Sequence, residues 1–310
     1  MPYSTDLVLS GPLRAPRQML ADQEYGGHSS IHDDATAETL GFRAGPIEGP
    51  THFSQFDPLM ARIWGRDWFE KGCISSHFLN MVVEGEEVRA FASMPAPGAT
   101  TTRAWAEKAD GTPVLEASAS IGPDHGETLL EARVKALRPH GPLVILGDMR
   151  PGLEGAEAPP EAMGMEEHNG PLYPFTLAQK LERMTEISPW HAGDNPWGRP
   201  IIPTEMVSVL AERNAEKAGW PVKHPAVGLY ADLEVRMVDG PLFVDEPYLI
   251  RREIVALAET RRTESYWVRT RIFDAAGKVE KARTLLNHAV LKQSHPGYDE
   301  KRAALEAAAG

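Results

Sequence analysis

The organisation of the chain is decided by two stretches, GPIEGPTHFSQFDPLMARIWG at residues 45–65 and RPIIPTEMVSVLAERNAEKAGW at residues 199–220. Both place Pro-Ile and then Pro-Thr ahead of apolar residues that recur at helical intervals. They lie about half of the 310 residues apart, so they form a weak internal repeat. The sequence therefore predicts two halves, each with one main helix.

Runs with strand character follow each predicted helix. In the first half they cover residues 74–83, 88–94, 101–107 and 114–121, and in the second half residues 227–238, 248–258, 266–273 and 281–291. One helix followed by antiparallel strands, twice over, predicts an α+β fold in which the halves pack side by side as a pseudo-dimer.

The predicted boundaries follow the repeat. We expect an N-terminal half over residues 1–140 and a C-terminal half over residues 175–295. Residues 141–174 are rich in Pro, Gly and Glu and are predicted to connect the halves. The tail, residues 296–310, is predicted to be a short terminal helix or frayed.

Composition excludes several classes of protein. The chain has 32 Lys and Arg against 44 Asp and Glu, a net charge of −12, which argues against binding to nucleic acid. The single cysteine, Cys73, excludes an intramolecular disulfide and a multi-cysteine zinc site. No apolar run approaches the ~20 residues of a membrane span, and the first residues lack the pattern of a signal peptide. We expect a cytoplasmic protein that does not contact membranes.

A resemblance to a known family becomes specific at GGHSSIHDDATAETLGFRAGPIEG, residues 26–49. This stretch resembles the signature of the MaoC-like enoyl-CoA hydratases and dehydratases, in which Gly-Asp-x-Asn-Pro-x-His is followed by Ala, Gly/Ala-Phe and Pro-Ile. With His32 as the family's His, Ala37, Gly41-Phe42 and Pro46-Ile47 keep the register. The resemblance implies a double hot-dog fold, two antiparallel sheets each wrapped on a central helix.

The sequence departs from the family pattern at the catalytic carboxylate. The family's Asp lies five residues before the His, and here that position is Gly27. Glu48-Gly49-Pro50 also replaces the usual His-Gly at the helix start. In the second half, SPWHAGDNPWGRPIIP at residues 188–203 resembles a shortened version of the motif, with Asp194 but no His after it.

Two arrangements could restore an acid/base pair. Each half could keep a local pair, His28 with His32 and His191 with Asp194, or His32 and Asp194 could form one site across the pseudo-dimer. Histidine and aspartate suit this chemistry because burial tunes their pKa values. The i, i+4 spacing of His28 and His32 also fits a metal site on a helix, but the glycines before them argue against a helix, and we expect no metal.

Further residues are candidates for contacting the substrate. Glu48, Gly49 and Glu205 lie at the two helix starts, and Trp197 follows Asp194. Gly49 could let substrate approach the backbone or could be a simple turn residue. His52 is predicted to be a packing or capping residue. The arginines between residues 251 and 271 either meet the phosphates of an acyl-CoA or form a solvated sheet face paired with glutamates.

Three functions follow. The first is a hydro-lyase that hydrates an α,β-unsaturated acyl thioester or dehydrates a β-hydroxyacyl one, with His32 and Asp194, helped by His191 and His28, as catalytic residues. The second is a hot-dog thioesterase in which Glu48 or Glu205 activates water. The third is a non-catalytic protein that binds an acyl ligand. No cofactor is expected, because nucleotide-binding glycine motifs are absent, and a homodimer is one expected assembly.

Overall fold

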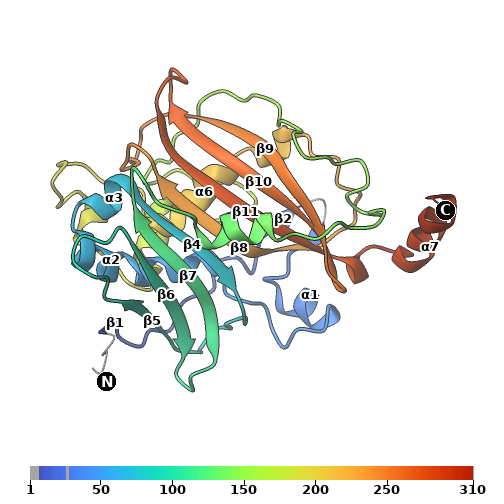
Figure 1. Ribbon diagram of the computed structural model, residues 1–310, viewed down its shortest axis with the longest axis horizontal. Helices are drawn as coiled ribbons and strands as arrows, with labels where there is room; N and C mark the ends of the chain where they lie inside the picture. The colour runs from blue at the N-terminus through green and yellow to red at the C-terminus, as the bar shows by residue number, and fades with distance from the viewer. Residues whose placement is uncertain (1–6, 26–27, 310) are drawn as a thin grey trace.

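The computed structural model describes residues 7–25 and 28–309. Its main feature is a nine-stranded antiparallel sheet with the order β1-β5-β6-β7-β4-β8-β11-β10-β9 (Figure 1). The strands of the first half are β1 (Val8–Ser10), β4 (Gly72–Phe78), β5 (Val88–Ser93), β6 (Thr101–Lys108) and β7 (Pro113–Ile121). Those of the second half are β8 (Gly228–Met237), β9 (Tyr248–Glu259), β10 (Thr263–Asp274) and β11 (Glu280–Leu291). A separate hairpin pairs β2 (Glu24–Tyr25) with β3 (His28–Ser29).

The two halves share one continuous sheet. The edge strand of each half, β4 and β8, pair antiparallel with one another, so that Ile74 lies opposite Val235 and Ser75 opposite Glu234. This pairing gives each half the backbone partner that an exposed edge would lack. The two predicted sheets are therefore joined edge to edge, and the eight long strands lie where the sequence predicts them.

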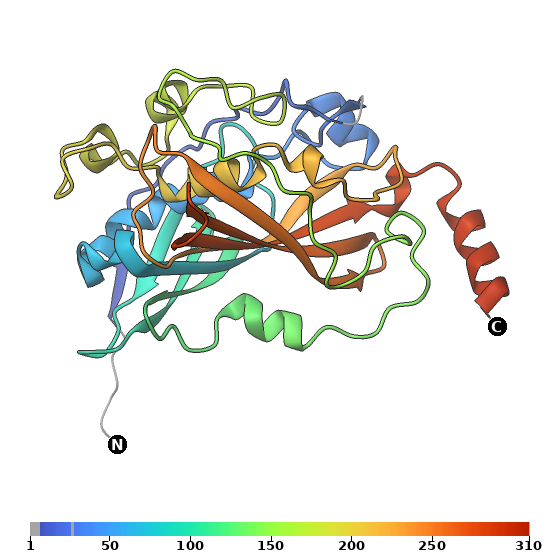
Figure 2. The same ribbon diagram turned by 90° about the horizontal axis from the view of Figure 1, so that it is seen from above.

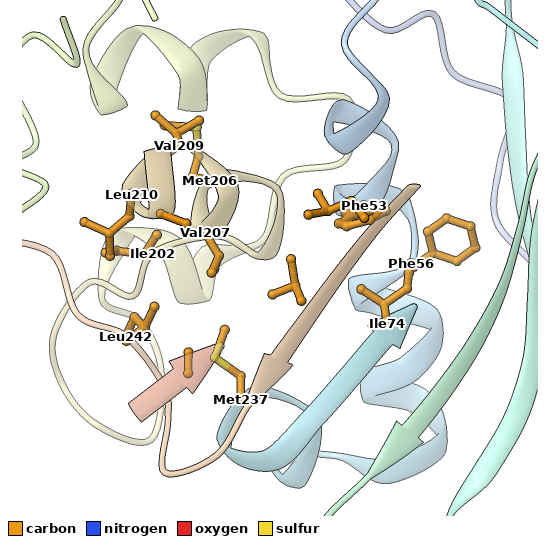
Figure 3. Packing of buried hydrophobic residues seen from close by; sticks show 14 of the residues in the cluster. Phe53, Phe56, Ile74, Ile202, Met206, Val207, Val209, Leu210, Met237 and Leu242 are labelled. Atoms are coloured by element: carbon orange, nitrogen blue, oxygen red, sulfur yellow. The ribbon is translucent and has the colours of Figure 1, made fainter. Parts of the chain in front are cut away.

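Helices cover one face of the sheet. In the first half η1 (Gly49–Gln55), α2 (Asp57–Trp64) and α3 (Asp67–Lys71) follow one another, and in the second half η3 (Thr204–Met206) runs into α6 (Val207–Glu212). Apolar side chains from both sets meet over the middle of the sheet (Figure 3). Phe53 and Phe56 belong to this cluster with Met206, Val207 and Leu210. The main helix of each half is thus present, in each case with a 3-10 first turn.

The opposite face carries a helix that the sequence analysis did not predict. Helix α4 (Leu129–Lys135) begins with a capping box formed by Thr128 and Glu131. It lies across the face of the sheet away from α6 (Figure 2). The Thr128 hydroxyl donates to Glu234 on β8 at 2.6 Å, and the Leu130 N–H donates to Ser75 on β4. Helix α4 therefore covers the boundary between the two halves, which we call the seam.

The segment predicted to connect the halves is packed against the second half. Leu143, Val144, Ile145, Leu146 and Met149 are buried against residues of β9, β10 and β11. The buried Glu264 carboxylate accepts hydrogen bonds from the N–H groups of residues 144, 145 and 146 at 2.7–3.0 Å. The segment has little regular structure, and its backbone is nevertheless fixed by this carboxylate.

The remaining helices lie at the periphery of the sheet. They are α1 (Asp34–Thr39), α5 (Leu177–Arg183), η2 (Pro189–Ala192), η4 (Ala215–Ala218), η5 (Lys292–Ser294) and α7 (Tyr298–Ala309). The tail is thus helical up to residue 309. Among the described helices, none has the length and apolar character needed to cross a membrane.

Candidate functional site

A cavity of about 920 Å³ lies at the helical face and receives residues from both halves. Tyr173, from the segment that connects the halves, also lines it. The titratable or hydroxyl-bearing residues that line it are His32, Glu48, His52, Tyr173, Glu212, Glu216, His224, Tyr230, Tyr266 and His288. Apolar side chains such as Phe42, Phe78 and Trp220 complete the wall. A concave, largely apolar wall with convergent polar groups is typical of a small-molecule site.

His32 is held in one orientation by its Nδ1 atom. This nitrogen lies 2.7 Å from the carbonyl oxygen of Pro46, and a carbonyl can only accept, so Nδ1 donates and the neutral ring leaves Nε2 as an acceptor. Asp33 caps α1 immediately afterwards and fixes the backbone beside the ring. Burial lowers the pKa of His32 to about 4. At neutral pH His32 is therefore a neutral base at the cavity wall.

Glu48 lines the same cavity at the start of η1. Its side chain is buried, with 7% of the residue exposed. Burial raises the pKa of this carboxyl to about 7, while the Lys180 charge opposes that shift. The Tyr173 hydroxyl interacts with the carboxyl and is itself 2.8 Å from the hydroxyl of Tyr230. A carboxyl with a pKa near neutrality can both give and take a proton.

Gly49 and His52 follow Glu48 along η1. A Cβ at Gly49 would lie 2.6 Å from the Phe78 ring, so the glycine makes room for Phe78, which stacks on Phe53 at 6.3 Å. His52 is buried, and burial lowers its pKa to about 4. Both residues line the cavity, which His52 was not predicted to do.

Three of the predicted residues of the second half lie away from this cavity. Asp194 is exposed, and neither it, His191 nor Trp197 is among the described lining residues. The Asn195 side chain bonds the Trp190 carbonyl and the Trp197 N–H, so this stretch forms a turn. The structure therefore does not bring Asp194 to the cavity that contains His32.

Trp197 belongs to an aromatic cluster beside α3. Trp197 packs edge-on against Trp190, with ring centroids 5.5 Å apart, and donates from Nε1 to Glu70. His191 is buried, and burial lowers its pKa to about 4. The sequence also pointed to Gly27 and His28. Gly27 and the side chain of His28 lie outside the described part of the chain.

Glu205 is buried in the seam between the halves. Its carboxylate forms an ion pair with the Lys180 ammonium at 3.0 Å, and both side chains are almost fully buried. The pair is held by charge, because neither carboxylate oxygen accepts a hydrogen bond from the described residues. Glu205 does not line the cavity, so it has no direct access to a ligand there.

The basic region of β9 and β10 lies outside the cavity too. Arg252 is buried and donates to the carbonyl oxygens of Ala211 and Arg213. Arg271 pairs with Glu280, and Arg269 lies 3.6 Å from Glu253. The observed contacts of these arginines are thus within the protein. Among the residues that the structure describes, no group of three His, Cys, Asp or Glu is arranged to hold a metal ion.

Most of the polar residues of the cavity were not predicted from the sequence, and they include Tyr173, Glu212, Tyr230 and His288. Tyr173 lies in the segment predicted to be a connection. Tyr230 and His288 are directly opposite one another on β8 and β11, with ring centroids 5.2 Å apart. The alternation of each strand predicts which face such residues share, but only the pairing of β8 with β11 brings them together.

Comparisons with known proteins agree on the fold. No protein-family model matches the sequence, and no curated protein matches it. A solved structure from Chloroflexus aurantiacus J-10-fl, described as a MaoC domain protein dehydratase, is similar with a TM-score of 0.57 and 14% identity, over 93% of this chain and 95% of that one. A conserved hypothetical protein of Mycobacterium tuberculosis with a double hot-dog fold is similar with a TM-score of 0.55 and 12% identity, over 93% of this chain and 97% of that one.

This chain has the double hot-dog fold. The similarity covers 93% of the chain and therefore spans both halves. Within this double hot-dog protein, the cavity combines side chains of the two halves, so neither half forms the site alone.

Proposed function

We propose that the protein is a hydro-lyase that adds water to an α,β-unsaturated acyl thioester, or removes water from the β-hydroxyacyl product. The observation that carries the proposal is the presence of two complementary groups in the wall of one cavity. His32 presents a neutral Nε2, and Glu48 is a carboxyl whose pKa is about 7. Groups whose environments drive their pKa values apart are suited to opposite roles in proton transfer.

The roles follow from the protonation states. In hydration His32 takes a proton from water while the water oxygen bonds to the β-carbon, and Glu48 donates its carboxyl proton to the α-carbon. In dehydration the same groups act in reverse, because forward and reverse reactions share one transition state. Glu48 thus supplies the carboxyl that the MaoC-like motif places at the position of Gly27. The Chloroflexus protein with the same fold, described as a dehydratase, also supports this choice of reaction.

Loss of the enoyl-thioester absorbance of crotonyl-CoA tests the proposal. We expect hydration by the unaltered protein, and a drop in kcat/KM of about 10²–10⁴-fold in both His32→Ala and Glu48→Gln. Asp194→Asn is the matched control, because it changes an exposed carboxylate outside the cavity. Its kcat/KM should equal that of the unaltered protein.

Two results would contradict the proposal. If Asp194→Asn loses as much activity as His32→Ala, a site shared by those two residues is the correct one. If free CoA is released without prior formation of the β-hydroxyacyl thioester, and Glu48→Gln abolishes that release, the protein is a thioesterase in which Glu48 activates water.

A further inference from the structure

A chain of contacts leads from Glu48 into the second half of the molecule. The Tyr173 hydroxyl interacts with Glu48 and lies 2.8 Å from the Tyr230 hydroxyl. The Tyr230 ring meets the edge of His288, and His288 faces Glu212. All five residues line the cavity. Glu212 and His288 therefore lie at the other end of this chain from the proposed catalytic carboxyl.

The Glu212 and His288 side chains leave a gap between them. His288 Nε2 is 3.8 Å from Glu212 Oε2, which is longer than a hydrogen bond. The His288 ring is fixed in its plane by stacking on Tyr266, with centroids 4.8 Å apart and planes 8° from parallel. Glu212 is buried, with 8% of the residue exposed. A buried acceptor thus faces a ring nitrogen in a rigid setting. The 3.8 Å between them is too short to hold an atom, and a ligand atom that lies to one side of the gap can contact both.

The charge of the cavity wall restricts which ligand groups can bind beside Glu212 and His288. Three carboxyl groups line the cavity, those of Glu48, Glu212 and Glu216, and no Lys or Arg is among the described lining residues. The residues that the structure does not describe include no Lys or Arg either. A carboxylate or phosphate brought here would meet like charge and would contact no Lys or Arg of the described wall, which is costly in a buried site.

We propose that Glu212 and His288 form a subsite for a hydroxyl group on the acyl part of the substrate, beyond the carbons that react. A hydroxyl oxygen placed about 2.8 Å from both atoms donates to the Glu212 carboxylate and accepts from the His288 N–H. A methyl group could make neither hydrogen bond, and a carboxylate could only accept. The inference rests on the proposed function in taking an acyl thioester as the ligand.

Binding of saturated thioesters tests the subsite without any turnover. Calorimetry compares unsubstituted acyl-CoA, ω-hydroxyacyl-CoA and ω-carboxyacyl-CoA with chains of four, six and eight carbons, because the hydroxyl must reach the gap. At one of these lengths we expect the hydroxyl compound to bind about tenfold tighter than the unsubstituted one, as for a hydrogen bond to a charged group. The carboxylate compound should bind about tenfold weaker than the unsubstituted one. Equal binding of the alkyl and hydroxyalkyl compounds at every length would overturn the proposal.

Substitutions test whether Glu212 and His288 cause the tighter binding of the hydroxyl compound. Glu212→Gln and His288→Phe should each bring the affinity ratio between hydroxyl and unsubstituted compounds close to one. His288→Phe keeps a ring that can stack on Tyr266, and thermal melting shows whether each variant is folded. Asp194→Asn is the control, because it changes an exposed carboxylate outside the cavity, and it should keep the hydroxyl preference. A preference that persists in both folded subsite variants contradicts the assignment.

The two proposals can fail separately. A hydroxyl preference without hydration of any enoyl-CoA supports the subsite and rejects the hydro-lyase. Hydration of crotonyl-CoA by a protein that shows no hydroxyl preference supports the reaction and rejects the subsite.

Discussion

Two buried groups, the His32 imidazole and the Glu48 carboxyl, set the pH range in which the proposed reaction can run. Hydration needs His32 neutral and Glu48 protonated. Burial lowers the pKa of His32 to about 4 and raises that of Glu48 to about 7. We therefore expect kcat/KM for crotonyl-CoA to be highest between these values, to fall as His32 is protonated below pH 4, and to fall as Glu48 ionises above pH 7. A pH profile between about pH 4 and 9, the range over which such groups titrate, measures this.

The predicted fall in kcat/KM above pH 7, the alkaline limb of the profile, can be tested by a substitution. In Glu48→Gln the group that ionises is absent, so the residual activity should no longer decline through pH 7. A decline that survives the substitution would assign the limb to another group.

The sequence was informative about single residues where a local motif specifies them. His32 follows from the register of residues 26–49, and Glu48 from its place at a helix start. Glu212, Tyr230 and His288 could not be found in this way, because they reach the cavity through the pairing of β8 with β11 and the end of α6. The exposed position of Asp194 shows the limit of such motifs, because a local motif does not determine whether a residue reaches the cavity.

At the level of elements, the ion pair between α5 and η3 matters for stability, because breaking it would leave a buried charge without a partner. Lys180 and Glu205 are both almost fully buried and 3.0 Å apart. We expect Glu205→Gln to lower the free energy of unfolding by about 3–5 kcal/mol, because the Lys180 charge would remain buried without a partner. Urea unfolding measures the loss.

The double variant Lys180→Met/Glu205→Leu separates charge from packing. With both charges removed, most of the lost stability should return, since no unpaired charge remains in the seam. A double variant as unstable as Glu205→Gln alone would show that shape, and not the isolated charge, causes the loss.

Strands were easier to predict than helices for a physical reason. Strand β5 alternates more and less buried residues along its length, β7 does so over part of its length, and this alternation is visible in the sequence. Helix α4 has only seven residues, and its stability comes from the Thr128 capping box and from contacts with β4 and β8. Such contacts join residues that are distant in the sequence, so periodicity alone does not reveal the helix.

For the whole molecule, the two halves use one position of the repeat in different ways. Pro50-Thr51-His52 and Pro203-Thr204-Glu205 occupy matching places in the repeat. In the first half this position gives His52, which lines the cavity. In the second half it gives Glu205, which pairs with Lys180 in the seam. A symmetric homodimer would have to use one residue for both purposes.

The seam between the halves also makes stability depend on pH. Asp57 on α2 accepts hydrogen bonds from Trp68 Nε1 at 2.8 Å and, across the seam, from Thr204 Oγ1 at 2.7 Å. Burial raises the pKa of this carboxyl to about 7. A carboxyl whose pKa is raised by folding stabilises the protein fully below its unfolded pKa, and this contribution is lost as pH rises through the folded value.

Asp57→Asn tests this linkage, because asparagine keeps an acceptor for Trp68 and Thr204 but cannot ionise. The stability of the variant relative to the unaltered protein should therefore increase between pH 5 and pH 8, by roughly 2–4 kcal/mol in the free energy of unfolding. Urea unfolding at the two pH values gives the difference. Asp67→Asn, on the neighbouring α3 and about half exposed, should show no such increase. If the two variants respond alike to pH, Asp57 is ionised at no cost in the folded protein, and the pH dependence of the seam must come from other groups.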